Sequence, residues 1–297
     1  MTLCTTAHDG ARWWRIIRSA TIRGRAAGLV RKNYSVPKAC HLLGLPAVEV
    51  AATSTGHLDY TDLQRKVEQH RSRPAIVVAN IGTTMTEAVD DVTCIHAALD
   101  AAGIAHRHVH SDAALAGIPL ACTRDRPAFD LADGADSLSV SGHKFLGTPL
   151  ACGLVLARRR PDELAPTVQY IGSRDTTISG SRSGLAAAML WYAITSNGDA
   201  GHVDRARGAR DLAEYAVQQL RSIGWPTWRN PLAMTVMLRP LPASMAALWP
   251  LPSDGDWSHI ICMPGVGKTQ IDRLVSHLAR EVHGIAPLAQ NWRSYPS

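Results

Sequence analysis

Three segments of this chain place side chains that could do chemistry directly after short apolar runs. They are Asn80-Ile-Gly-Thr-Thr84, His110-Ser-Asp-Ala-Ala114 and Ser141-Gly-His-Lys144. A lysine amine can bind a carbonyl group covalently, and a carboxylate can keep a nearby ring nitrogen protonated. Lys144 follows Asp112 by about 30 residues, and two small alanines come directly after the acid. These residue types in this order favour a covalently held aldehyde cofactor with a basic ring.

Pyridoxal phosphate is the cofactor whose chemistry uses each of these groups. It needs a lysine to hold its aldehyde, an acid to keep its pyridine nitrogen protonated, and small residues on which the flat ring can lie. Each segment alone has an ordinary explanation, because Asp112 could cap a helix or a turn and Gly142-His-Lys144 could be a surface loop. Their shared position after predicted strands is what favours the cofactor.

The residues around these segments alternate between predicted strands and helices. We expect strands at 47–52, 75–80, 108–112, 137–141 and 153–157, and helices at 36–43, 60–71 and 92–102. Short apolar strands that alternate with helices form a largely parallel sheet covered on both faces. Ligands bind at the carboxyl ends of the strands in such sheets. The sequence therefore predicts an α/β fold in which one sheet edge gathers the three segments.

The pattern changes near residue 196. A long amphipathic helix is expected at 204–223, a strand region at 225–252, a strand at 259–263 and a helix at 269–282. We therefore expect a basic N-terminal segment over residues 1–32, a large cofactor-binding domain over 33–195 and a smaller α+β domain over 196–297. Gly265-Val-Gly-Lys-Thr269 lacks the first glycine of a phosphate-binding loop and is interpreted as a turn before the last helix.

Composition narrows the class of protein. Hydrophobic residues make up 46% of 297, and no apolar run reaches the roughly 20 residues of a membrane span. Six scattered cysteines without a Cys-x-x-Cys pair fit the cytoplasm better than a disulfide framework. The net charge of +6 is concentrated between Ala11 and Lys32, where seven residues are basic. We therefore expect neither a membrane nor a nucleic-acid partner.

A metal site is a weaker interpretation of the histidines near Asp112. His106, His108 and His110 alternate along a predicted strand and could share a face, as three ligands of zinc would require. No acid or cysteine spacing completes such a site, so no metal is expected.

Five collinear segments resemble one enzyme family. They are Asn33-Tyr-Ser-Val-Pro-Lys38, Asn80–Thr84, His110–Ala114, Ser139-Val-Ser-Gly-His-Lys144 and Ser173–Arg182. Together they resemble the group II pyridoxal-dependent decarboxylases, and within that group the bacterial histidine decarboxylases and the similar plant serine decarboxylases. The resemblance runs from about Asn33 to the C-terminus. It implies a fold-type-I large domain, a smaller C-terminal α+β domain, a homodimer or higher homo-oligomer, and pyridoxal phosphate as the cofactor.

The resemblance also implies roles for matching positions around the cofactor ring. Lys144 would be the Schiff-base lysine, and Asp112 would pair with the pyridine nitrogen. Ala114 would pack against one face of the ring. Thr84 would bond near the cofactor's phenolic oxygen or the substrate carboxylate.

Further positions would hold the rest of the cofactor. Ser141 and His143 would hold the phosphate. Asn33 stands where the family has a histidine that stacks on the ring, and asparagine cannot stack comparably. The family's upstream Gly-Thr-Glu-Gly-Asn-type phosphate loop has no counterpart in residues 1–32. We therefore expect residues 1 to about 33 not to be homologous to the family, and we expect weak cofactor binding with little activity.

The implied reaction is decarboxylation of an L-amino acid, with histidine, giving histamine and carbon dioxide, as the first choice of substrate. Serine is the second choice. A degenerate or non-catalytic subunit that pairs with a complete one is an alternative, and so is another fold-type-I enzyme such as an aminotransferase.

Overall fold

The computed structural model of the protein describes residues 27–30, 35–159, 167–174 and 182–282. The chain divides into two compact units, Met1–Ala206 and Arg207–Ser297. Within the described residues, no helix is long and apolar enough to cross a membrane.

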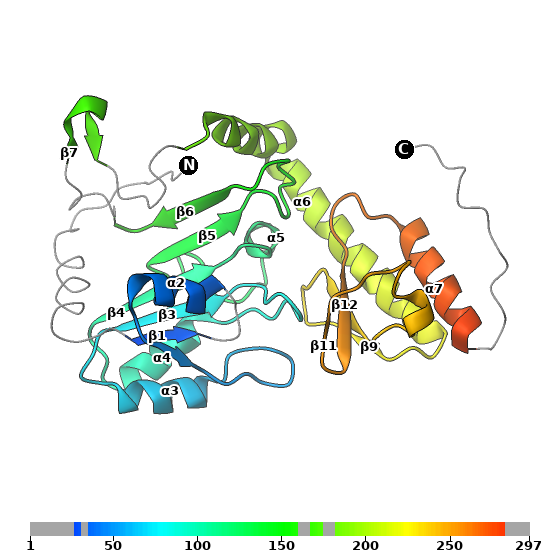
Figure 1. The fold of residues 1–297 in the computed structure, drawn as a ribbon, viewed down its shortest axis with the longest axis horizontal. Helices are drawn as coiled ribbons and strands as arrows, with labels where there is room; N and C mark the ends of the chain where they lie inside the picture. Colours follow the sequence, from blue (N-terminus) through cyan, green and yellow to red (C-terminus); the bar gives the residue numbers. More distant parts are fainter. Residues whose placement is uncertain (1–26, 31–34, 160–166, 175–181, 283–297) are drawn as a thin grey trace. The chain divides into compact units, whose positions relative to one another are not determined.

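The first unit is built on a six-stranded sheet whose spatial order is β2-β1-β3-β4-β5-β6 (Figure 1). The strands are β1 (Ala27–Val30), β2 (Ala47–Glu49), β3 (Ala75–Asn80), β4 (Arg107–Asp112), β5 (Ser137–Ser141) and β6 (Gly153–Ala157). All neighbours pair in parallel except β5 and β6, which are antiparallel. The predicted α/β class with a mostly parallel sheet is confirmed. β1 adds a strand from within the first 32 residues that the sequence does not predict.

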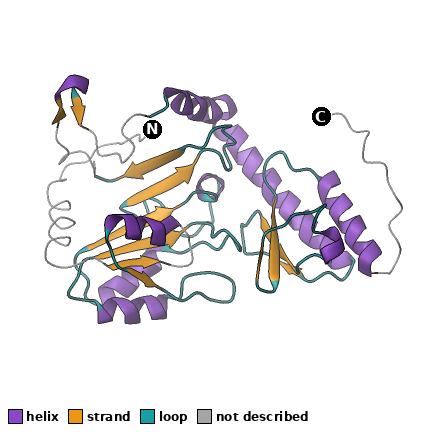
Figure 2. Ribbon diagram, in the orientation of Figure 1, coloured by secondary structure: helices purple, strands orange, loops and turns teal. Residues whose placement is uncertain are grey.

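Helices fill the connections between these strands. They are α2 (Ser35–Leu43), α3 (Tyr60–Gln69), α4 (Val92–Ala101) and the short α5 (Gly117–Ala121). Figure 2 shows the resulting alternation of helix and strand. Asp59 and Asp91 cap α3 and α4 by accepting backbone N–H groups of the first turn, as aspartate does at a helix start. Helices α3 and α4 pack against each other.

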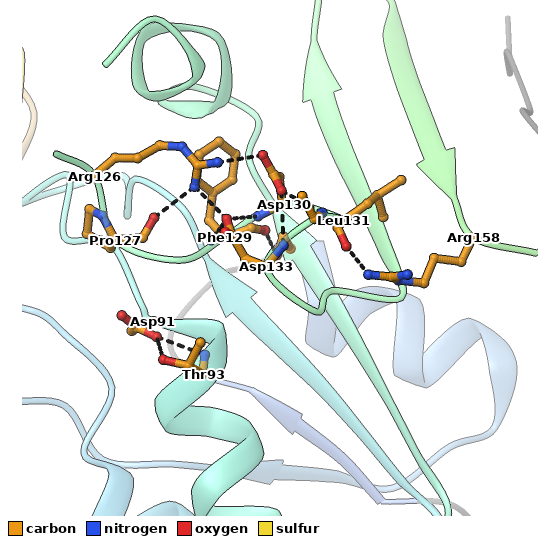
Figure 3. A network of polar contacts seen from close by, with 11 residues as sticks. Asp91, Thr93, Arg126, Pro127, Phe129, Asp130, Leu131, Asp133 and Arg158 are labelled. Atoms are coloured by element: carbon orange, nitrogen blue, oxygen red, sulfur yellow. Dashed lines mark hydrogen bonds and ion pairs between the residues drawn. The ribbon is translucent and has the colours of Figure 1, made fainter. Parts of the chain in front are cut away.

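The loop from α5 to β5 is held by one arginine (Figure 3). The Arg126 guanidinium pairs with Asp130 at 2.7 Å and Asp133 at 2.5 Å, and it lies 4.6 Å from the centre of the Phe129 ring. The guanidinium of Arg158, the residue directly after β6, donates hydrogen bonds to the carbonyls of Leu131 and Ala135. These contacts tie the loop together just before β5 begins.

Later parts of the first unit are less regular. A small hairpin pairs β7 (Thr167–Val168) with β8 (Ser173–Arg174), and a short 3-10 turn (Gln169–Ile171) connects them. Helix α6 spans Gly184–Ser222 and is interrupted at Gly198 (φ 59°, ψ 179°), which is non-helical backbone. The predicted helix at 204–223 is therefore the second part of a longer broken helix. Its start was missed because the glycine break follows a mixed polar and apolar stretch.

The second unit has its own core. The antiparallel sheet has the order β11-β12-β10-β9 and is accompanied by α7 (Lys268–Val282). Its strands are β9 (Thr227–Trp228), β10 (Thr235–Leu238), β11 (Ser253–Asp254) and β12 (Trp257–Ile261), with a 3-10 turn at Ala243–Met245. Fully buried residues of this core include Leu220, Leu238 and Leu278. The Gly265–Gly267 segment is a turn before α7, as predicted.

Candidate active site

A row of polar side chains crosses the carboxyl edge of the first unit's sheet. Asn80 at the end of β3 pairs in register with Asp112 at the end of β4, and Asp112 pairs with Ser139 of β5. Residues in register on neighbouring parallel strands point to the same face. Asn80 is buried, whereas Asp112 and Ser139 are half-buried. The expected gathering of polar groups at this edge is therefore present.

The backbone after Asp112 continues alongside β5. The N–H of Ala113 donates to the carbonyl of Ser139 at 2.9 Å, and the N–H of Ser141 donates to the carbonyl of Ala114 at 3.2 Å. The N–H of Ala114 donates to Asp112 Oδ1 at 3.3 Å. The carboxylate of Asp112 is thus followed directly by two small side chains, those of Ala113 and Ala114.

A tight turn after β5 carries His143 and Lys144. The Gly142 N–H donates to the Cys152 carbonyl at 2.9 Å, and the Thr148 N–H donates to the Gly142 carbonyl at 3.0 Å. A Cβ at Gly142 would lie 2.5 Å from Cys152 Sγ, so only glycine fits this close approach.

The turn is anchored so that its lysine faces outward. Phe145 is buried, and its carbonyl accepts from the Arg205 guanidinium at 3.0 Å. His143 and Lys144 are exposed, and His143 Nδ1 lies 3.3 Å from the Cys152 carbonyl. The buried Phe145 fixes the backbone next to Lys144, while the lysine side chain is exposed. An exposed amine on a fixed backbone suits covalent attachment of a ligand.

The loop after β3 brings Thr84 to the same edge. The N–H groups of Gly82 and Thr83 both donate to the Ala88 carbonyl at 3.0 Å, which closes the loop on itself. Thr84 is exposed at its tip. The buried carboxylate of Asp90 holds the loop base by accepting the Asn80 N–H at 2.8 Å.

Two histidines lie on the same face as Asp112, further along β4. Burial, with a smaller contribution from the neighbouring His108, lowers the pKa of His110 to about 4 against the opposing effect of Asp112. Burial also lowers the pKa of His108, against the opposing charge of Asp136. Both rings are therefore neutral near pH 7.

Most of the predicted site residues lie on neighbouring strand ends of one sheet. Asp112, Ala114, Ser141, His143 and Lys144 follow β4 and β5, and Thr84 follows β3. Asn33 lies outside the described residues. The sequence motifs include Asn80 and Ser139 but predict no role for either residue. A polar residue that closes the apolar run AIVVAN was the available signal for Asn80.

The residues at this edge fit pyridoxal phosphate. Asp112 offers an acid for the pyridine nitrogen, Lys144 offers an amine for the aldehyde, and Ala114 offers a small side chain for the ring. Asn80 adds a further sign of a ligand, because its buried Nδ2 has no hydrogen-bond partner. A buried donor left unmade costs roughly 1–3 kcal/mol, a cost that an acceptor supplied by a ligand would remove. Nowhere in the described ranges do three or more His, Cys, Asp or Glu residues gather to hold a metal ion.

This fold and this edge define a pyridoxal-phosphate-dependent enzyme. Residues 17–224 match the pyridoxal-dependent decarboxylase conserved domain, and the chain belongs to that family of carboxy-lyases. The predicted family and its cofactor are confirmed. The match begins at residue 17, before the boundary near Asn33 that the motifs predict, and β1 lies inside the matched range.

Two curated relatives are histidine decarboxylases. A histidine decarboxylase of Mesorhizobium japonicum is 44% identical over 248 residues, which cover 83% of this chain and 67% of the relative. A histidine decarboxylase of Vibrio campbellii is 38% identical, over 82% of this chain and 64% of the relative. The chain thus spans about two thirds of the length of these relatives.

Solved structures share the fold. L-methionine decarboxylase from Streptomyces sp. 590 matches with a TM-score of 0.73 at 24% identity, over 86% of this chain and 70% of that chain. Sphingosine-1-phosphate lyase from Burkholderia pseudomallei K96243 matches with a TM-score of 0.71 at 21% identity, over 90% and 64% of the two chains. At these identities the likeness concerns the fold alone.

Proposed function

We propose that this chain decarboxylates an L-amino acid with pyridoxal phosphate, and that histidine is its substrate, giving histamine and carbon dioxide. The observation that carries the proposal is the placement of Asp112 and Lys144 after neighbouring strands of one sheet. The choice of histidine rests on curated relatives up to 44% identical that bear this activity.

Each residue at the edge has a separate task in this proposal. Lys144 anchors the cofactor through its aldehyde carbon, and Asp112 holds a proton on the pyridine nitrogen. When bound, pyridoxal phosphate accepts the electron pair that remains at Cα as carbon dioxide leaves. Ala114 packs against the ring, and Thr84 faces the phenolic oxygen or the substrate carboxylate. Ser141 and His143 bind the phosphate.

The proposal extends to assembly and location. Large apolar side chains are exposed on the first part of α6, before Gly198, and include Leu185 (58%), Trp191 (66%) and Tyr192 (67%). Exposed apolar groups gathered on one segment favour a protein interface, and we assign this one to a second copy of the chain. Sedimentation equilibrium giving the mass of one chain at micromolar concentration would contradict the homo-oligomer. We place the protein in the cytoplasm, because its six cysteines are scattered without a Cys-x-x-Cys pair, a pattern typical of a reducing compartment.

The experiment that tests the activity is a titration of the protein with pyridoxal phosphate, followed by amine and carbon dioxide detection with L-histidine and L-serine. Lys144→Ala should abolish the cofactor's protein-bound absorbance band and the amine product. Lys268→Ala, at an exposed lysine of α7, serves as the matched control and should change neither. A keto-acid product would indicate an aminotransferase, and an intact band in Lys144→Ala would refute the assignment. Binding without any product would favour the non-catalytic subunit.

A further inference from the structure

A chain of hydrogen-bonding side chains runs along the face of β4 and β5 that carries Asp112. His108, His110 and Asp112 alternate with residues of the opposite face, so they line one side of the strand. On β5 the register partners of His110 and Asp112 are Ser137 and Ser139. Four polar side chains therefore lead along the sheet toward the predicted cofactor acid.

Both nitrogens of the His110 ring are engaged within this chain. His110 Nδ1 lies 2.8 Å from Ser137 Oγ, and His110 Nε2 lies 3.1 Å from Ser139 Oγ. Ser137 Oγ also lies 2.8 Å from His108 Nε2. Two hydroxyl groups thus hold the imidazole in one orientation, at mostly buried positions where a wrong partner would be costly.

The hydrogen count at Ser137 constrains the arrangement. A serine hydroxyl has one hydrogen and can also accept, so it can receive a hydrogen from one ring and give its own to the other. Neutral rings satisfy every contact in this row of side chains, and a charge on a buried ring would be costly. The lowered pKa values of both rings agree with the neutral arrangement.

A carboxylate stands near each end of this row of side chains. Asp112 is the carboxylate that acts electrostatically on His110, whereas Asp136 acts on His108. A negative carboxylate favours dipoles whose hydrogens point toward it. We therefore expect His110 to carry its hydrogen on Nε2 and to donate it to Ser139, the register partner of Asp112.

We propose that His110 is a positioning residue for Asp112: an uncharged ring, held by Ser137 and Ser139, that supports the carboxylate and leaves its charge for the cofactor's pyridine nitrogen. This inference rests on the proposed function. It assigns a task to a histidine that neither anchors the cofactor nor touches the reacting bonds.

Nitrogen NMR of histidine side chains in the cofactor-free protein tests the arrangement independently of catalysis. The expected result at neutral pH is a single neutral form of His110 with the hydrogen on Nε2. In Ser139→Ala this preference should weaken. A charged ring would overturn the proposal. A ring with its hydrogen on Nδ1 would also overturn it, because His110 would then donate to Ser137 and not to Ser139, the residue beside Asp112.

Cofactor affinity tests the consequence for Asp112. His110→Leu removes both hydrogen bonds and should weaken pyridoxal phosphate binding by about tenfold or more. His110→Gln keeps an uncharged donor and should recover most of the affinity. His96→Leu is the control, since His96 is another half-buried histidine of this unit with one ring contact, to the Gly134 carbonyl at 3.0 Å.

Two substitutions that remove only a hydroxyl group test the same inference if His110→Leu does not fold. Ser139→Ala should weaken cofactor binding about threefold. Ser111→Ala should leave it unchanged, because Ser111 faces the opposite side of β4 and donates to the Phe129 carbonyl at 2.6 Å. If the wild type binds pyridoxal phosphate and His110→Leu or Ser139→Ala binds it with the same affinity, the role of His110 is refuted but the proposed function is not. Loss of Lys144-dependent binding by the wild type removes the proposed function as well.

Discussion

Asn80 buries an amide nitrogen that has no hydrogen-bond partner, beside the register position of Asp112. Asn80→Leu preserves the approximate shape and removes the unmade donor. We expect it to raise the stability of the cofactor-free chain by roughly 1 kcal/mol, since an unpaired buried polar group is a net cost. We expect the same substitution to weaken pyridoxal phosphate binding. Thermal unfolding without cofactor and a cofactor titration measure the two effects.

Asn80→Asp is the matched variant, because it keeps the size but replaces the donor with an acceptor. It should lose cofactor affinity without the gain in stability. If Asn80→Leu instead lowers stability and binds the cofactor normally, the amide serves the fold and not the ligand.

Glu87 is a buried residue with φ of 50°, in the left-handed region that favours glycine. A side chain with a Cβ is strained there by about 1–2 kcal/mol. Glu87→Gly should relieve that strain and Glu87→Ala should not, so of these two variants the glycine one should have the higher free energy of unfolding, by roughly 1 kcal/mol after the larger entropy loss of glycine is subtracted. Chemical denaturation measures the change.

Two variants separate backbone strain from side-chain effects at this loop. Glu87→Ala keeps the Cβ and should not give the gain. Gly82→Ala should destabilise, because Gly82 has φ of 94° and a Cβ there would lie 2.7 Å from that of Ala116. Lower stability in Glu87→Gly would show that contacts of the glutamate outweigh the strain.

At the scale of elements, helix α4 depends on the capping residue that precedes it, Asp91 (Figure 3). Asp91 Oδ1 accepts the N–H of Thr93 at 2.8 Å and the N–H of Cys94 at 3.2 Å. Asp91→Ala should therefore cost about 1 kcal/mol of stability, whereas Asp91→Asn should keep most of it because asparagine caps nearly as well. Hydrogen exchange of the first-turn amides measures this locally. Equal protection in Asp91→Ala and the wild type would contradict the cap.

The ends of elements show where sequence patterns work and where they stop. Strands β3 and β5 have the predicted bounds, because continuous apolar or alternating runs end at polar groups. Strand β2 is shorter than predicted and ends at Glu49, since pairing with β1 covers only three residues. Pairing is a property of two segments, so a single segment's pattern overestimates it.

At the scale of the whole molecule, buried neutral histidines predict sensitivity to acid. Burial lowers the pKa of His108 and His110 in the first unit and of His259 in the second. For His110 the value falls from 6.5 to about 4. Between these values the unfolded chain binds the proton and the folded chain does not, so stability is full above pH 6.5 and falls as the pH drops toward 4.

The loss at His110 alone should be of the order of 3 kcal/mol across this window. Denaturation at a series of pH values should show a decline in the wild type and a smaller decline in His110→Leu. An identical decline in the two proteins would mean that His110 is not the neutral group in the folded chain.

The sequence by itself determined the fold class and the family and predicted roles for Lys144 and Asp112, because local hydrophobic periodicity and short motifs carry that information. Tertiary structure alone decided that Asn80 and Ser139 flank Asp112, that His110 is held between two serines, and that Glu87 sits in a left-handed conformation. These facts depend on register between strands and on burial. Both arise only when segments far apart in the chain pack together, so no single segment encodes them.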